Sequence, residues 1–481
     1  MKPTTLQKAL AFTLCLVLLS SVFPGALAAK KPKTAEELGY LPPEELLAED
    51  GKTIRFNDSW VQKALEQQYP HLMEEDGSFL KDSLKGVVSL TIGVDMIDND
   101  RTAYEKVYEA ACNEEHFLAE VESVDLSVLQ FCTKLYGVTI IAQRVDSLAA
   151  FSKSKEWNKW LHLIGIKNLN LDACPSIPKL ISLDLAACEV QSYEPLKKCK
   201  SLMNLYLSGK AITDISFILQ LPKVTCLSLF DASNADLTPL LEKKSLSIVH
   251  LDMRGAAEND IRWQVASKCR DLSIRNCLEI SPETVEKYLS KCSSIYFFYS
   301  EKPAQAVDFS ALRGAKDLTD LYFFDANIGD LSFLAELPKL IWFGTEDSLV
   351  KNASGLFSAP KLQNIWLENS TIENWGTFEE PAKAKKLSGV IFDSCGLTDL
   401  SFVNGLSLKY LWLNGNEITD ISLLARAKKI EKLSLSDNPI TDFSPLAEIK
   451  GLKMVQHNSS ETLPEIKKVK IVEGDFGHWA Y

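Results

Sequence analysis

Residues 411–455 read LWLNGNEITDISLLARAKKIEK and then LSLSDNPITDFSPLAEIKGLKMV. The second stretch repeats the first at a spacing of 22 residues, so that Leu411 returns as Leu433 and Asn416 returns as Asn438. Each copy begins with alternating apolar residues, which indicates a short strand, and continues into a turn. One such unit cannot bury its own apolar face, so the pattern predicts that neighbouring copies stack and share a core.

The same register runs through most of the chain. From Leu90 to Val455, an alternating apolar stretch begins every 21 to 26 residues. This period is typical of a leucine-rich repeat, and it predicts one continuous solenoid of about sixteen turns over residues 87–455, with one parallel sheet on its concave face. The predicted strand heads are Leu90, about His116, Val138, Leu161, Leu183, Leu205, Leu227, Val249, Leu272, Ile295, Leu321, Phe343, Ile365, Val390, Leu411, Leu433 and Val455.

A second motif recurs on the other side of eight of the turns. It consists of Asp, then Ile, Leu or Phe, then Ser or Thr. Asp and Ser side chains accept hydrogen bonds from the free N–H groups that begin a helical turn, while the apolar residue between them points inward. The motif therefore predicts short 3₁₀ segments on the convex face. It occurs at Asp125, Asp214, Asp236, Asp308, Asp330, Asp399, Asp420 and Asp442.

These units resemble the bacterial internalin-type leucine-rich repeat, which has the same 22-residue period and short convex segments. The resemblance covers residues 87–455 and implies a right-handed β/α superhelix that binds other macromolecules on its concave sheet. The chain departs from the pattern at the Asn position, which is kept only at Asn416 and Asn438. Cys188, Cys277 and Cys395 are among the residues that occupy this inward position in other turns.

The first 50 residues carry no repeat. Residues 1–28 place Lys2 and Lys8 before an apolar run and end in Ala-Leu-Ala, which predicts a cleaved signal peptide and an extracellular or cell-surface protein. Loss of the two lysines takes the net charge from −12 to −14. An acidic exported chain is poorly suited to nucleic acid or anionic lipid. Residues 29–50 are rich in Lys, Glu and Pro, which predicts a flexible leader.

Both ends of the repeat array need cover. Residues 51–86 are predicted to form an N-terminal cap with one amphipathic helix at about 59–69, and Ser59 and Gln62 have the spacing of a capping box. A further helical stretch is expected near 103–112. Residues 456–481 are predicted to cover the last turn. Their final eight residues weakly resemble the opening of an S-layer homology module, a cell-wall-binding unit.

The sequence contains no recognisable catalytic or cofactor motif. No Gly-rich phosphate loop, HExxH or G-x-S-x-G occurs, and none of the six histidines has a partner at catalytic spacing. Neither zinc-type Cys–His spacing nor a CxxC pair is present, so no metal is expected. The ten cysteines outside the signal peptide are expected to be mostly free, buried thiols, since several occupy inward positions of the repeat.

The informative residues are those that the repeat does not require. Side chains alternate along a strand, so the neighbours of an inward Leu face the concave surface. This register predicts a polar or small face early in the array and an aromatic face later, which is typical of a binding site. The alternative is that the rings only stack across strands and stiffen the sheet. The candidate ligand-binding residues are Tyr296, Phe298, Tyr322, Phe324, Trp342, Trp366, Tyr410 and Trp412.

The sequence therefore predicts an exported, non-catalytic binding protein that recognises a macromolecule, favouring a protein partner, through this face. No cofactor and no integral membrane span in the mature chain are expected. A glycan or a cell-wall component is the alternative partner, because Trp and Tyr platforms also stack on sugar rings. An enzyme whose site has no recognisable motif is the remaining alternative.

Overall fold

The computed structural model describes residues 41–94, 119–154, 159–177, 179–209, 212–230, 232–376, 384–458 and 469–473. The chain divides into two compact units, Met1–Asp252 and Met253–Tyr481, each of which is described by itself. The division falls within the predicted repeat array, whose continuity over 87–455 stays a prediction. The predicted signal peptide and the helix expected near 103–112 lie outside the described residues.

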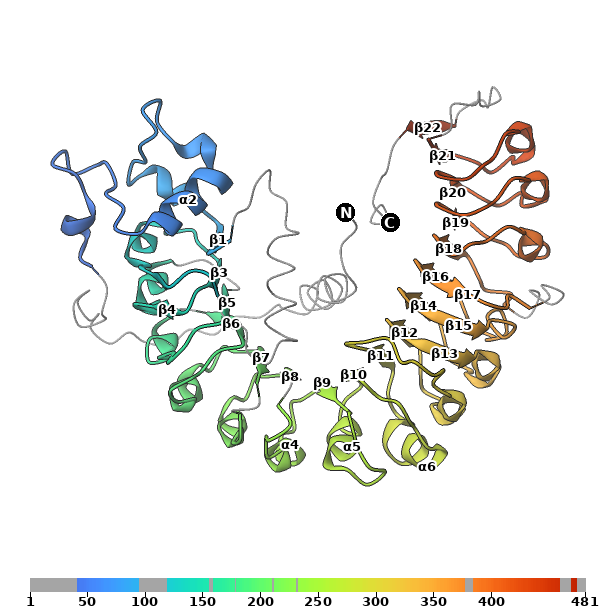
Figure 1. The fold of residues 1–481 in the computed structure, drawn as a ribbon, viewed down its shortest axis with the longest axis horizontal. Helices are drawn as coiled ribbons and strands as arrows, with labels where there is room; N and C mark the ends of the chain where they lie inside the picture. The colour runs from blue at the N-terminus through green and yellow to red at the C-terminus, as the bar shows by residue number, and fades with distance from the viewer. Residues whose placement is uncertain are drawn as a thin grey trace. The chain divides into compact units, whose positions relative to one another are not determined.

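The first unit is built on a parallel sheet of short strands joined by convex segments (Figure 1). Each strand pairs in parallel with the next one in the order β1-β3-β5-β6-β7-β8-β9. The strands are β1 (Ser89–Ile92), β3 (Gly137–Ile141), β5 (Lys159–Ile164), β6 (Leu180–Ala186), β7 (Asn204–Ser208), β8 (Cys226–Phe230) and β9 (Ile248–Asp252).

The second unit repeats this arrangement, with the strands paired in parallel from β10 to β22. They are β10 (Asp271–Arg275), β11 (Ser294–Phe298), β12 (Asp320–Phe324), β14 (Trp342–Glu346), β16 (Asn364–Glu368), β18 (Gly389–Asp393), β19 (Tyr410–Trp412), β20 (Lys432–Ser434), β21 (Met454–His457) and β22 (Lys470–Glu473). The last of these was not predicted, because the sequence pattern stops at Val455.

The predicted strand heads align across the paired strands within each unit. Leu321 pairs with Phe343, for example, and Leu411 pairs with Leu433. One prediction was wrong. Leu90 pairs directly with Val138, so no strand headed near His116 stands between β1 and β3. His116 itself lies outside the described residues. The aligned strand heads and the parallel pairing confirm the leucine-rich repeat fold that the period predicted.

All eight Asp motifs perform the predicted capping. In each, the Asp Oδ1 accepts a hydrogen bond from the backbone N–H two residues later, at 2.5–2.9 Å. The apolar residue between them is buried in every case. The segments that follow are 3₁₀ turns at Ser127–Phe131, Ser216–Gln220, Ser310–Gly314, Ser332–Glu336, Ser401–Val403, Ser422–Arg426 and Ser444–Glu448, and the short helix α4 (Thr238–Glu242).

Other convex segments depart from the simple 3₁₀ pattern. The turns after β9 and β10 lack the Asp motif and carry instead α5 (Ile261–Ala266) and α6 (Pro282–Thr284), which continues into a π-helical turn at Val285–Leu289. A second, three-stranded parallel sheet and a two-stranded one were also not predicted. They consist of β13 (Asn327–Asp330), β15 (Leu349–Asn352) and β17 (Thr371–Ile372), and of β2 (Ser123–Val124) and β4 (Arg144–Val145).

The N-terminal cap helix α2 spans Ser59–Gln68, close to its predicted bounds. The capping box expected at Ser59 was wrong, because Asp58 is the N-cap and its carboxylate accepts from Trp60 N and Val61 N at 2.8 and 2.9 Å. At the other end, Gln68 exchanges two hydrogen bonds with the backbone of Thr91, at 2.7 and 3.0 Å. The Tyr69 hydroxyl bonds the backbone of Val88 and Ser89. The cap therefore satisfies the free edge of β1.

The inward Asn position is filled by several chemistries. Asn416 donates to the backbone carbonyls of Phe392 and Leu413, at 2.5 and 2.9 Å. Cys188 and Cys395 donate their thiols to strand carbonyls of the preceding turn, at 3.2 and 3.5 Å. Small donors therefore replace part of the asparagine ladder.

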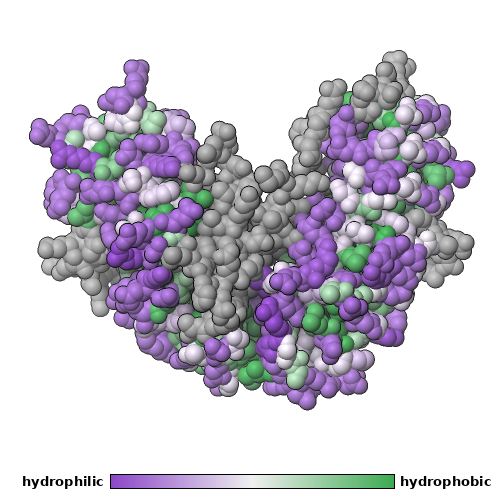
Figure 2. All heavy atoms as spheres, viewed as in Figure 1, coloured by the Kyte–Doolittle hydropathy of each residue, from purple (hydrophilic) through white to green (hydrophobic). Residues whose placement is uncertain are grey.

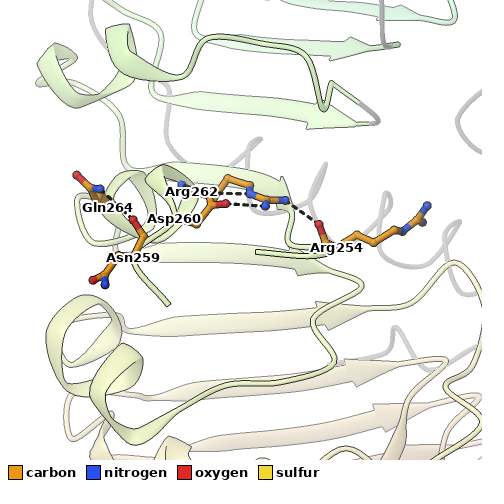
Figure 3. A network of polar contacts seen from close by, with 5 residues as sticks. All are labelled: Arg254, Asn259, Asp260, Arg262 and Gln264. Atoms are coloured by element: carbon orange, nitrogen blue, oxygen red, sulfur yellow. Dashed lines mark hydrogen bonds and ion pairs between the residues drawn. The ribbon is translucent and has the colours of Figure 1, made fainter. Parts of the chain in front are cut away.

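Arg254 occupies the repeat position that corresponds to Asn416, but Arg254 is exposed. Its side chain points away from a network centred on Asp260 and Arg262 (Figure 3). Arg262 makes a two-point contact with the Asp260 carboxylate, at 2.9 and 2.7 Å, and donates to the Arg254 carbonyl at 3.1 Å. Asp260 also caps α5 by accepting from Arg262 N at 2.8 Å. This network holds the turn after β9, which lacks an Asp motif.

Candidate binding surface

In the second unit, side chains alternate between the core and the opposite face of the sheet, which we call the distal face. In β11, Ile295 and Phe297 are fully buried in the core, and Tyr296 and Phe298 alternate with them. Register pairing then puts Tyr322 beside Tyr296 and Phe324 beside Phe298. The predicted register is confirmed, and the eight candidate residues lie on the distal face.

The eight rings differ in exposure. Trp342 is the most exposed, at 38%, and is one of the few large apolar side chains exposed in the described part of the chain. The described surface is otherwise mainly hydrophilic in the view of Figure 2. Tyr296, Phe298, Trp366 and Tyr410 are half-buried, and Tyr322, Phe324 and Trp412 are buried. Three of the rings are thus less exposed than the sequence predicted, since neighbouring rings lie against them.

Five of the rings contact one another, and we call Tyr296, Phe298, Tyr322, Phe324 and Trp366 the ring cluster. The Tyr296 and Tyr322 rings are stacked, with centroids 5.2 Å apart and planes 3° apart. The Phe298 and Phe324 rings are also stacked, 4.5 Å and 8° apart. Trp366 lies 6.2 Å from both Tyr322 and Phe324. The rings of the aromatic column therefore stack across neighbouring strands, as the alternative interpretation expected.

Gly344 allows the Tyr322 and Trp366 rings to come into contact. It lies between them in the register of β12, β14 and β16. A Cβ atom at this position would come within 2.5 Å of the Tyr322 ring and 3.1 Å of the Trp366 ring. The absence of a side chain lets rings two strands apart close over the glycine backbone.

Tyr410 and Trp412 form a separate pair, with centroids 6.1 Å apart. Lys432 places its ammonium 5.4 Å from the Tyr410 ring centroid, within range of a cation–π contact. Ile391, which has no aromatic ring, stands between Trp366 and Trp412 in the same register column. The structure therefore brings five of the predicted residues together, places two apart, and leaves Trp342 at the first position of β14.

Carboxylates continue the ring column at the fifth strand position. Phe324 is followed in register by Glu346, Glu368 and Asp393 on β14, β16 and β18. Trp366 Nε1 donates to Glu368 Oε2 at 3.2 Å and so joins the rings to the acidic residues. Sequence reasoning missed these residues. Alternation along each strand could have identified them, because the fifth strand position lies on the distal face together with the first and third positions.

The distal face of the first unit is more polar, as predicted, with Asp184, Ser228 and His250 in its third-position column. Sequence reasoning missed Trp160, whose ring covers Gly137 on the neighbouring strand and lies 4.6 Å from the His162 ring. The pairing of β5 with β6 shifts in register between Lys159 and Trp160.

The nine cysteines in the described part of the chain are all free and buried, as expected. Burial raises the pKa of the Cys132, Cys226 and Cys292 thiols to about 12, so each stays protonated at neutral pH. Within the described ranges, no three His, Cys, Asp or Glu side chains gather to ligate a metal ion. None of the helices described has the length and apolar character that a bilayer crossing demands.

Comparison with known proteins supports the fold. A family model for leucine-rich repeats (two copies) matches residues 406–448. The crystal structure of a TLR13–ssRNA13 complex is similar, with a TM-score of 0.53 and 18% identity over 73% of this chain and 52% of that chain. No curated protein matches the sequence significantly.

Two internalin structures from Listeria monocytogenes also match. One is internalin InlF from strain 4b F2365, with 15% identity over 92% of this chain and 99% of that chain and a TM-score of 0.30. The other is the functional domain of InlJ, described as including a cysteine ladder, with 12% identity over 84% and 80% and a TM-score of 0.32. The leucine-rich repeat itself is evident from the register and the capped 3₁₀ segments described above.

Proposed function

We propose that this leucine-rich repeat protein is an exported, non-catalytic binding protein that recognises a protein partner through the ring cluster and Trp342. The observation that carries the proposal is the ring cluster itself: five mutually contacting aromatic side chains on the distal face of β11, β12 and β16. The repeat requires apolar residues only on the core side. Large aromatic residues at the centre of an interface are the usual anchors of binding energy.

The geometry of the rings favours a protein over a glycan. A sugar ring stacks on an open aromatic face. The Tyr296–Tyr322 and Phe298–Phe324 pairs are stacked nearly parallel, so each uses one face of every ring internally. The exposed Trp342 and the half-buried rings of Phe298 and Trp366 remain as contacts of the kind that protein interfaces use. A glycan therefore stands as the second candidate.

Two observations support a non-catalytic, exported chain. The protonated thiols are poor nucleophiles, and the acidic residues of the Asp motifs are used as caps. Export is supported by the signal-peptide pattern of residues 1–28.

The test is a binding screen of the full chain, without its signal peptide, against purified surface proteins and a glycan array. For a protein that binds, Trp342→Ala and Trp366→Ala are expected to weaken affinity by about 2 kcal/mol or more each. Trp160→Ala in the first unit is the matched control and is expected to leave affinity unchanged. Normal affinity in folded Trp342→Ala plus Trp366→Ala protein would show that the rings only stiffen the sheet.

A further inference from the structure

The first three strands of the first unit present an uncharged surface on the distal face. Its first and third strand positions hold Ser89 and Thr91 on β1, Gly137 and Thr139 on β3, and Trp160 and His162 on β5. Burial lowers the pKa of His162 to about 4, so its ring is neutral at physiological pH. The surface ends at β6, where Asp184 follows His162 in register. In a chain with 24% charged residues, six neighbouring positions without a charge favour an uncharged ligand.

The Trp160 indole lies over the backbone of β3, because residue 137 is glycine. A Cβ atom at Gly137 would come within 2.4 Å of three indole atoms, so the ring occupies the space that a side chain would fill. The planes of the neighbouring His162 and Tyr136 rings meet the indole at 40° and 68°. Neither ring is stacked in parallel on the indole, in contrast to the stacked pairs of the ring cluster. A half-buried indole of this kind offers a face on which a sugar ring stacks.

Hydrogen-bonding groups adjoin the indole. In the described part of the chain, no hydrogen bond engages the indole N–H of Trp160 or the hydroxyls of Ser89 and Thr91. All three side chains are half-buried rather than enclosed. A hydroxyl group both donates and accepts, as the hydroxyl groups of a sugar do. These groups therefore match the polar edges of a sugar ring, while the indole matches its apolar face.

The margin of this surface is exposed and carries no charge. Val88 and Tyr136 precede β1 and β3, are each 39% exposed, and are joined by a hydrogen bond from Tyr136 N to the Val88 carbonyl at 2.9 Å. Exposed apolar residues that adjoin one another mark interaction surfaces, whereas single ones are ordinary. Lys159, at the start of β5, directs its ammonium group into the core, where it donates to the Ser154 carbonyl and lies over the Phe151 ring.

We propose that this surface is a second binding site, at which a neutral oligosaccharide stacks on Trp160 beside Tyr136. The hydroxyls of Ser89 and Thr91 supply hydrogen bonds to it. The site lies in the first unit and is separate from the ring cluster and from the protein partner proposed for that cluster. The strands β1, β3 and β5 together span about 10 Å, which suits a short run of sugar rings. An anionic polysaccharide or a nucleic acid would need basic side chains, which these positions lack.

The test is isothermal titration of the full chain, without its signal peptide, with three neutral hexasaccharides: cellohexaose, mannohexaose and N-acetylchitohexaose. At least one of them is expected to bind. Trp160→Ala is expected to weaken that binding about tenfold or more, because the stacking surface is lost. Trp160→Phe keeps an aromatic face and is expected to lose less. Hexagalacturonate, which carries six carboxylates, is expected to bind more weakly than the neutral sugars.

The matched control is Trp60→Ala, which removes a half-buried tryptophan from α2 in the same unit and is expected to leave the sugar affinity unchanged. Circular dichroism verifies that each variant is folded. Tyr136→Ala, at an exposed position, gives the same comparison if Trp160→Ala unfolds. Binding of none of the neutral sugars, or equal binding by the parent and the folded Trp160→Ala variant, would overturn the inference. Tighter binding of hexagalacturonate would contradict the neutral ligand.

The variants also separate this inference from the proposed function. Sugar binding that is lost in Trp366→Ala protein and kept in Trp160→Ala protein would place the sugar on the ring cluster and overturn the second site. A protein from the screen that loses affinity with Trp160→Ala would show that this surface binds protein instead. The proposed function fails separately, if the protein partner binds normally to folded Trp342→Ala plus Trp366→Ala protein, whatever the sugars do.

Discussion

The distal columns of β6–β9 and of β11–β16 differ sharply, although one repeat builds both. The first presents Asp184, Tyr206, Ser228 and His250. The second presents Tyr296, Tyr322, Gly344 and Trp366. The strand heads of both groups face the core and are all buried, and all are aliphatic except Phe343. The fold therefore dictates one side of each strand and leaves the other side free to carry function.

The strongest test of this division compares adjacent residues on opposite sides of β12. Phe323 is fully buried among Phe297, Phe309 and Phe343, and Phe323→Ala is expected to lower the free energy of unfolding by about 3–5 kcal/mol. Phe324→Ala loses the contacts of a buried ring with Phe298 and Trp366 but opens no cavity in the core, and is expected to cost about 2–3 kcal/mol. Chemical denaturation measures both. Equal losses would mean that the ring cluster is a second core.

Gly344 and Ser228 occupy the same column position in the two strand groups and give a smaller contrast. Gly344→Ala forces the Tyr322 ring to move and is expected to cost about 1–3 kcal/mol, as well as weakening any ligand bound at the rings. Ser228 Oγ is buried with no hydrogen-bond partner among the described residues. Ser228→Ala is therefore expected to change stability by less than about 0.5 kcal/mol. Thermal unfolding measures the stability of both variants. A Gly344→Ala variant as stable as the parent would contradict this prediction.

Acid is expected to weaken both units alike, because both use the same caps. Hydrogen bonds from the backbone N–H groups of Ser216, Ser422 and Ser444 are the main cause that lowers the pKa of Asp214, Asp420 and Asp442 below 3.8. A pKa lowered by folding adds stability above the unfolded pKa, and that stability is lost as pH falls through the folded pKa. Unfolding midpoints are therefore expected to fall below about pH 4.

The double variant Asp420→Asn, Asp442→Asn sharpens this prediction, since asparagine also caps helical turns but does not titrate in this range. Its midpoint is expected to depend less on pH between 2 and 5 than that of the parent. An unchanged pH dependence would show that these caps are not the groups that titrate.

The smallest effect is expected from reductant. Cys188 and Cys395 fill the same inward position in the two units, and burial raises the pKa of both thiols to about 12. Because the nine described cysteines are free, reductant is expected to leave the unfolding midpoint unchanged, and denatured protein to titrate nearly all of its thiols. Four or five disulfides in the purified protein would contradict this.

Strand positions were predictable from the sequence because burial leaves little choice there. An inward position such as Leu411 or Leu433 accepts only a residue that fills the shared core, so the period survives in the sequence. The Asp motifs were predictable for a similar reason, since few side chains can satisfy the N–H groups of a tight turn. Helices α5 and α6 were not, because their turns lack the motif and are held by contacts such as Arg262 to Asp260.

The candidate site was only partly predictable. Alternation along a strand indicated which rings share the distal face, yet their stacking depends on residues one and two strands away. Trp366 reaches Tyr322 only because residue 344 is glycine. The carboxylate column has the same origin: Glu346 and Glu368 are unremarkable in sequence and gain meaning from their register with Phe324.

The edge of β1 has a further consequence for the solubility of the protein. An uncovered strand offers its N–H and C=O groups to any other strand, which makes it a template for end-to-end polymerisation. Here the Gln68 amide and the Tyr69 hydroxyl bond those groups on Ser89 and Thr91, so side chains close the edge without adding another strand. The double variant Gln68→Ala, Tyr69→Phe is accordingly expected to form oligomers that grow with protein concentration, even while each molecule keeps its native repeats.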